Sequence, residues 1–173
     1  DLIEEITGAI EDEFEVEPPL VLADAVTPGR VVLDVEAGTI AEAVRLVLGG
    51  VPPAELPLPA AKIIQAVIER EQMFSTYLGR GLSIPHARLE GIEKTAVFFA
   101  RLSPPIPVEG HEEGARLLFI LVSPAREPRS QVRYLARIAC LMDSGFVAER
   151  LREARGVPEI LEAIRAGEPL SQT

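Results

Sequence analysis

Two uninterrupted apolar runs limit the folds open to this chain more than any other feature. The first is Ala96-Val97-Phe98-Phe99-Ala100, and the second is Leu117-Leu118-Phe119-Ile120-Leu121-Val122. Such runs are typical of strands that are covered on both faces, because a half-exposed strand alternates apolar and polar residues. We therefore expect strands over residues 94–102 and 116–123, in a sheet with helices on both sides.

The rest of the chain alternates between helical and extended patterns. A strand is expected over 31–35, and helices are expected over 39–48 with Thr39 as the N-cap, 60–74, 130–142 with Ser130 as the N-cap, 146–154 and 158–166. Residues 75–81 and 103–114 are expected to be loops, and residues 83–86 to be extended because they precede or include a proline. This alternation predicts an α/β protein with a mixed β-sheet sandwiched by helices.

Composition and charge exclude several classes of function. The chain has 173 residues and a net charge of −10, and eight of its 27 acidic residues lie in residues 1–17, which hold no base. Nothing resembles the basic surface of a nucleic-acid-binding protein, so no nucleic-acid partner is expected. No apolar run reaches the roughly 18–20 residues that cross a bilayer. Two histidines and one cysteine are too few for an ordinary structural zinc site. We therefore expect no metal and no organic cofactor.

The segment 70–87 carries the candidate chemistry. It contains Arg70-Glu71, Ser75-Thr76, two glycines at 79 and 81, and Ser83 shortly before Pro85-His86. A neutral imidazole is a nucleophile near neutral pH. Arginine and hydroxyl donors beside it suit an anionic reactant, of which a phosphoryl group is the simplest. Glycines would let the backbone approach a phosphate closely.

The same residues resemble the fructose/mannitol-type enzyme IIA domain (EIIA type 2) of the phosphoenolpyruvate-dependent sugar phosphotransferase system. The resemblance rests on Arg70-Glu71, Ser75-Thr76, Gly79, Gly81 and Ile84-Pro85-His86, followed by the strand 117–122 and Ser123-Pro124. It implies an enzyme-IIA fold in which His86 accepts a phosphoryl group and Arg70 neutralises its charge. Thr76, Ser75 and Ser83 then donate hydrogen bonds to the phosphoryl oxygens. The implied phosphodonor is a histidine phosphocarrier protein, and the implied acceptor is a sugar permease component.

One position departs from the family pattern. Many relatives carry a second histidine near the start of the helix that follows the central strand, and Gln131 stands there in this chain. Glutamine can donate a hydrogen bond but cannot become cationic. The replacement weakens the case for transfer to a permease and favours a regulatory use of the phosphoryl group. The other histidine, His111, lies in a loop and is interpreted as a surface residue.

The acidic leading segment has a resemblance of its own. Residues 1–13 resemble the end of the second CBS motif in CorC/HlyC-type membrane transporters. We expect residues 2–17 to form a short helix that runs into an acidic tail, and Pro18-Pro19 to mark a boundary. Residues 1–24 would then be the end of a CBS-like region with its linker, and residues 25–173 the phosphotransfer domain. Because the chain does not begin with methionine, we expect a fragment of a longer protein, cytoplasmic and tethered to the inner membrane through the missing N-terminal region.

Two functions stay open at this point. One is a phosphohistidine carrier or regulatory domain of phosphotransferase type, which relays the phosphoryl group or displays it as a signal. The other is a non-catalytic regulatory or ligand-sensing module of a membrane ion or solute transporter, whose partners are the transporter's own membrane and CBS domains. A serine or cysteine hydrolase is disfavoured, because no nucleophile–base pair is apparent.

Overall fold

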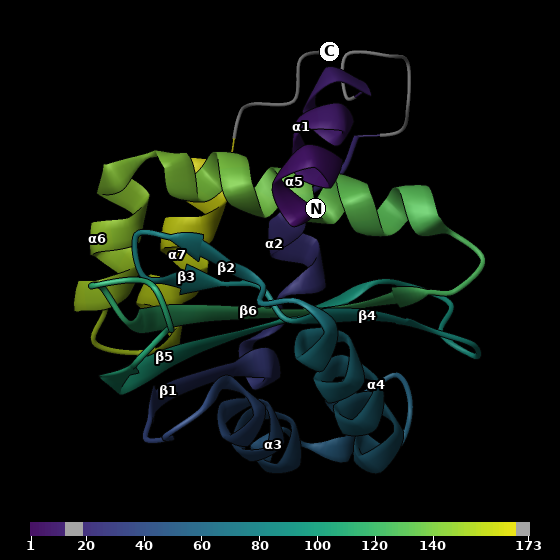
Figure 1. Ribbon diagram of the computed structural model, residues 1–173, viewed down its shortest axis with the longest axis horizontal. Helices are drawn as coiled ribbons and strands as arrows, with labels where there is room; N and C mark the ends of the chain where they lie inside the picture. The colour runs from purple at the N-terminus through teal and green to yellow at the C-terminus, as the bar shows by residue number, and fades with distance from the viewer. Residues whose placement is uncertain (13–18, 169–173) are drawn as a thin grey trace.

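Within residues 1–12 and 19–168, which the computed structural model describes, six strands form a mixed sheet between two layers of helices (Figure 1). The strand order is β1-β5-β6-β3-β2, and β4 also pairs with β6. β1 is parallel to β5, β5 is antiparallel to β6, and β3 and β4 are parallel to β6. The strands are β1 (Val31–Val35), β2 (Tyr77–Gly79), β3 (Leu82–Ser83), β4 (His86–Leu89), β5 (Ala96–Ile106) and β6 (Ala115–Pro124).

The two apolar runs form the centre of the sheet, as β5 and β6. Their side chains alternate between two separate cores, so that Phe98 packs in one core and Phe99 in the other. Phe99 meets Phe119 edge to face, with the ring centroids 5.1 Å apart. All three phenylalanines of these runs are fully buried. Burial of each is worth about 2–3 kcal/mol, so the central pair of strands contributes much of the driving force for folding. The prediction of an α/β sandwich with a mixed sheet is confirmed.

Helices cover both faces of the sheet. α3 (Ile40–Gly50) and α4 (Ala60–Met73) lie on the lower face in Figure 1, and α2 (Leu22–Ala25), α5 (Pro128–Asp143), α6 (Gly145–Glu153) and α7 (Val157–Gly167) lie on the upper face, together with α1 (Leu2–Asp12). The expected N-cap at Thr39 is confirmed, because its side chain accepts a hydrogen bond of 3.1 Å from the backbone N–H of Glu42.

Three local expectations are wrong. α5 begins at Pro128 rather than after Ser130, whose hydroxyl instead lies 3.3 Å from that of Thr95. Proline suits the first turn of a helix because its missing N–H would have no intrahelical partner there. The segment expected as a loop over 75–81 contains β2, which pairs with β3. β5 runs on to Ile106, because that residue pairs with Ala115 of β6 beyond a register shift.

A largely buried ion pair joins the segment before β1 to the end of α7. The carboxylate of Glu168 accepts hydrogen bonds from the backbone N–H groups of Leu22 and Ala23, at 2.8 and 2.7 Å. Arg137 on α5 lies 3.4 Å from the same carboxylate and donates to the carbonyl of Leu20 at 2.7 Å. Leu20 and Leu22 are buried in the upper core. The segment that precedes β1 is therefore built into the fold, and the expected boundary between residues 24 and 25 falls inside α2.

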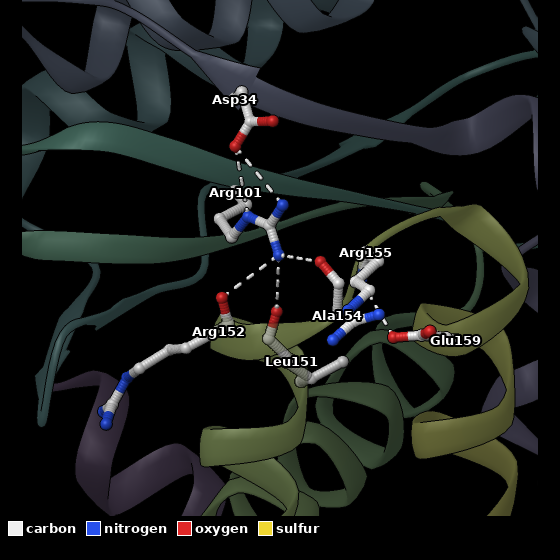
Figure 2. A network of polar contacts seen from close by, with 7 residues as sticks. All are labelled: Asp34, Arg101, Leu151, Arg152, Ala154, Arg155 and Glu159. Carbon is white, nitrogen blue, oxygen red and sulfur yellow. Dashed lines mark hydrogen bonds and ion pairs between the residues drawn. The ribbon is translucent and has the colours of Figure 1, made fainter.

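A second polar network joins the sheet to α6. Figure 2 shows Arg101 on β5 with Nη1 directed at the carbonyls of Leu151, Arg152 and Ala154, at 3.2, 3.1 and 2.6 Å. Nε and Nη2 of the same guanidinium contact Asp34 at 3.3 Å. The last carbonyls of a helix have no intrahelical donors, and a cation stabilises them. Arg101 therefore caps α6 and fastens it to β1 through Asp34.

In residues 1–12 and 19–168, no helix is both long enough and apolar enough to cross a bilayer.

Candidate functional site

His86 is the first residue of β4 and lies in register with Leu121 of β6. Its side chain is 2% exposed. The ring atom Nδ1 lies 2.8 Å from the carbonyl oxygen of Ile84, two residues earlier. A carbonyl can only accept a hydrogen bond, so in the neutral ring Nδ1 carries the proton and Nε2 keeps its lone pair. The backbone bend at Pro85 thus sets which nitrogen of His86 is available as a nucleophile.

The surroundings of His86 keep its ring neutral. The pKa of His86 is lowered from 6.5 to about 4, chiefly by burial; the hydrogen bond to Ile84 opposes this shift, and the nearby charge of Arg70 adds to it. Burial acts in this direction because it removes water from the cationic form. At pH 7 almost every molecule therefore carries the unprotonated, nucleophilic form of the ring.

His86 lines a pocket of about 490 Å³ between α4, β4 and α5, onto which α1 also projects. The lining combines two arginines with two carboxylates and an amide; it comprises Glu5, Ala66, Glu69, Arg70, Met73, His86, Ala87, Arg88, Ala125 and Gln131. The pocket thus brings together three residues that the sequence singled out: His86, Arg70 and Gln131.

Arg70 reaches this pocket from the last turns of α4. Its Nη1 donates to the carbonyl of Phe74 at 3.1 Å, which bends the side chain around the end of the helix. Among the described residues this is the one hydrogen bond of its guanidinium, and Arg70 also lines the pocket, so further N–H donors are available there. A guanidinium with donors to spare beside a neutral imidazole is suited to bind the oxygens of an anion.

Thr76, which is buried, pairs with the partly buried Glu71 in the loop after α4. The hydroxyl of Thr76 donates to Glu71 at 2.6 Å and its backbone N–H donates to the same carboxylate at 3.3 Å. Burial raises the pKa of the Glu71 carboxyl, while the bonds from Thr76 and the charge of Arg70 oppose that rise. Thr76 is fully buried, so its contact with Glu71 anchors the loop after α4.

The remaining hydroxyls of the motif lie outside the described lining of the pocket. Ser75 accepts a hydrogen bond from the backbone N–H of Tyr77 at 3.2 Å. The hydroxyl of Ser83 is fully buried and finds no partner among the residues that the structure describes. Both placements are local to the loop and to β3, whereas Arg70 and Gln131 face the pocket directly.

The expectation for the two glycines is wrong. Gly79 and Gly81 have φ values of 90° and 79° and form the turn between β2 and β3, with Arg80 also left-handed between them. The carbonyl of Gly81 accepts hydrogen bonds from the N–H groups of Arg116 and Leu117, at 2.8 and 2.9 Å. Positive φ explains why glycine stands there. The glycines thus shape the hairpin and do not line the His86 pocket.

The structure adds residues that the sequence motif did not single out. Arg88, two residues after His86 on β4, brings a second cation to the pocket, and Glu69 and Glu5 bring carboxylates. Strand alternation could have placed Arg88 on the same side as His86, because residues two apart on a strand share a face. Nothing local could have placed Glu5, since α1 reaches the pocket through tertiary packing.

His111, by contrast, lies away from this pocket. It is exposed in the loop between β5 and β6, and its ring meets that of Tyr77 at a centroid distance of 4.6 Å.

Comparisons with known proteins place this geometry in a family. Residues 25–167 match the model of the phosphoenolpyruvate-dependent sugar phosphotransferase system, EIIA 2. A nitrogen regulatory protein from Pseudomonas aeruginosa is 30% identical over 135 residues, which cover 77% of this chain and 87% of the relative. The crystal structure of nitrogen regulatory protein IIA-Ntr from Neisseria meningitidis has a TM-score of 0.75 and 23% identity, covering 84% of this chain and 99% of that one.

A third similar protein was solved together with a partner protein. Enzyme IIA mannitol from Escherichia coli, solved in complex with phosphorylated enzyme IIB mannitol, has a TM-score of 0.67 and 25% identity, covering 80% of this chain and 95% of that one. The mixed sheet, the sequence motif around His86 and the family match agree with one another. The chain belongs to the EIIA 2 family of the phosphoenolpyruvate-dependent sugar phosphotransferase system.

Proposed function

We propose that His86 of this domain accepts a phosphoryl group on Nε2 from a histidine phosphocarrier protein. The observation that carries the proposal is the 2.8 Å contact between Nδ1 and the carbonyl of Ile84, inside a pocket that Arg70 also lines. That contact keeps the proton on Nδ1, so the lone pair on Nε2 can attack phosphorus.

The step balances without further reactants. The bond between phosphorus and the imidazole nitrogen of the donor breaks, and a bond between phosphorus and Nε2 of His86 forms. The donor's imidazole leaves with the electron pair of the broken bond. The ring of His86 becomes cationic when Nε2 is phosphorylated, and the Ile84 carbonyl stabilises the Nδ1–H that carries this charge. Arg70, with Arg88 nearby, offsets the negative charge on the phosphoryl oxygens.

The phosphoryl group then serves as a regulatory mark. Gln131 supports this reading, because it lines the pocket and, unlike the second histidine that the family resemblance implies there, cannot supply a positive charge. The nitrogen regulatory protein of Pseudomonas aeruginosa supports it as well. The second candidate is relay to a sugar permease component. The mannitol enzyme IIA, which was solved together with its phosphorylated IIB partner, favours that candidate.

Intact-mass analysis tests the acceptor chemistry. The chain is incubated with phosphoenolpyruvate, enzyme I and the histidine phosphocarrier protein, beside the variants His86→Ala and His111→Ala. We expect an acid-labile gain of one phosphoryl group in the parent chain and in His111→Ala, and none in His86→Ala. No gain in the parent with a cognate donor set would overturn the proposal and leave the non-catalytic sensing module of a transporter.

A second measurement separates the mark from the relay. Phosphorylated protein is mixed with a family IIB component, and loss of the phosphoryl group is followed by mass. Retention in the parent chain, with faster transfer in Gln131→His, supports the regulatory mark. Fast transfer from the parent supports relay.

A further inference from the structure

α1 packs on α5 and contributes one residue, Glu5, to the lining of the His86 pocket. Figure 1 shows it, in purple, crossing α5, against which it packs. Leu2 and Ile6 are 7% and 5% exposed and belong to the upper core. They are four residues apart and so lie on one face of the helix. From the same helix, Glu5 lines the pocket together with His86, Arg70 and Arg88.

The side chain of Glu5 carries a negative charge, as does an incoming phosphoryl group. Glu5 lines a pocket whose cations, Arg70 and Arg88, are those that a phosphoryl group on His86 would use. A carboxylate and a phosphoryl group are both anions that arginine binds well, so the two compete for the same side chains. Repulsion between them makes the docked helix and the phosphorylated histidine unfavourable together.

The attachment of α1 is also weak enough to be reversible. The helix has 11 residues, which is short for a stable isolated helix. On its described face, two apolar side chains are buried, and Ile3 is 62% exposed. A few contacts of this kind allow local opening at a small free-energy cost compared with global unfolding.

We propose that α1 is an intramolecular cap on the phosphoryl-acceptor site. Docked, it shields His86 from a phosphodonor protein and adds the negative charge of Glu5 to the lining of the pocket; undocked, it opens the pocket. This inference rests on the proposed function of His86. Coupling between two such states is reciprocal, so phosphorylation of His86 releases α1 by the same factor by which docked α1 disfavours phosphorylation.

Accessibility of His86 tests the cap without any phosphoryl chemistry. Diethyl pyrocarbonate modifies exposed imidazoles, and exposed His111 serves as the internal reference in the same molecule. Ile6→Asp places a charge in the buried face of α1, and Ile3→Asp places the same charge on its exposed face as the matched control. We expect the His86-to-His111 labelling ratio to rise about tenfold in Ile6→Asp and less than twofold in Ile3→Asp. Equal ratios in all three proteins would overturn the cap.

Phosphorylation rates test the role of Glu5. Glu5→Gln removes the charge in the pocket, and neighbouring Glu4→Gln removes the same charge where it does not line the pocket. We expect phosphorylation about three- to tenfold faster in Glu5→Gln and in Ile6→Asp, and unchanged in Glu4→Gln. If the parent is phosphorylated and Glu5→Gln is no faster than Glu4→Gln, competition by Glu5 is wrong. If no variant is phosphorylated while the labelling ratio still rises, the cap stands and the proposed phosphoryl transfer fails.

Discussion

Two arginines of this molecule, Arg101 and Arg70, differ in how many of their hydrogen-bond donors are engaged within the protein. Arg101, on β5, directs its guanidinium at three carbonyls at the end of α6 and at the carboxylate of Asp34 (Figure 2). Arg70, at the end of α4, makes one hydrogen bond, to Phe74, among the residues that the structure describes, and otherwise faces the His86 pocket. An arginine whose donors are already engaged holds the fold together, whereas one with donors to spare can bind a ligand.

Removing Arg70 is expected to give the largest effect. In Arg70→Ala, the phosphorylation rate of His86 should fall about 100- to 1,000-fold, because a preorganised cation at the transferring group is lost. The free energy of unfolding should change by less than about 1 kcal/mol, since the side chain makes a single exposed hydrogen bond. Quench-flow phosphorylation and urea denaturation check the two halves. Equal phosphorylation in the parent and in Arg70→Ala would break the contrast.

Arg101→Ala should show the opposite pattern. The free energy of unfolding is expected to fall by about 2–4 kcal/mol, because carbonyls at the end of α6 lose a charged donor that is 15% exposed. Phosphorylation of the protein that stays folded should stay within twofold of the parent. Urea denaturation measures the loss, and Arg101→Lys, which keeps the charge but not the fork of donors, should lose about half as much. A loss below about 0.5 kcal/mol would show that the network contributes little.

The pH dependence of stability that His86 causes extends the contrast between the reactive His86 pocket and the stabilising Arg101 network. Its pKa is lowered from 6.5 to about 4 in the fold, so between these values the unfolded chain binds more protons. The contribution of His86 to stability is therefore fully present above pH 6.5 and is lost as the pH falls toward 4. From pH 7.5 to pH 5, His86 should account for a loss of about 2 kcal/mol.

Subtraction isolates this contribution from those of other groups. The raised pKa of Glu71 acts in the opposite direction, because its carboxyl gains a proton more readily in the fold. Urea denaturation of the parent and of His86→Gln at both pH values gives the difference, in which Glu71 cancels. An identical pH dependence in the two proteins would show that the ring is not kept neutral by the fold.

Thr76→Val should give the smallest effect of the set. It removes the 2.6 Å hydrogen bond to Glu71 and leaves a buried carboxylate oxygen short of a donor, which costs about 1–2 kcal/mol. Thr76→Ser keeps the hydroxyl and should recover most of that loss. If Thr76 anchors the loop rather than binding the phosphoryl group, phosphorylation in Thr76→Val falls no more than a few-fold. A fall as large as that of Arg70→Ala would place Thr76 among the phosphate ligands.

The sequence predicted the centre of this fold better than its edges. Strands β5 and β6 were recognisable because continuous apolar runs of this length are typical of strands that are covered on both faces. The helix 40–50 was recognisable because Thr39 marks its start. The two-residue strand β3 and the turn before it depend on pairing with β6, which no local pattern records. Ser130 failed as a cap because Pro128 already begins the helix.

The candidate site divides in the same way. His86 and Arg70 were singled out by their motif and Gln131 by the family resemblance, and the fold brings all three to one pocket. Thr76 was singled out by the same spacing, but its donors point to Glu71. The direction of a side chain in a loop depends on which buried acceptor lies nearby, and spacing along the chain does not encode that. Glu5 lies 81 positions before His86, so only tertiary packing brings them together.

The contacts of Glu168 with Leu22, Ala23 and Arg137, called here the Glu168 clasp, limit how far the domain can be shortened. The family match spans residues 25–167, yet the carboxylate that holds the start of α2 belongs to Glu168, and Leu20 and Leu22 fill the upper core. A protein trimmed to the matched residues would lose the clasp from both ends at once and leave Arg137 without the carboxylate and the carbonyl that it contacts. The segment that matches the family is therefore shorter than the segment that the domain needs to fold. A gene fusion would have to include the flanking residues as well.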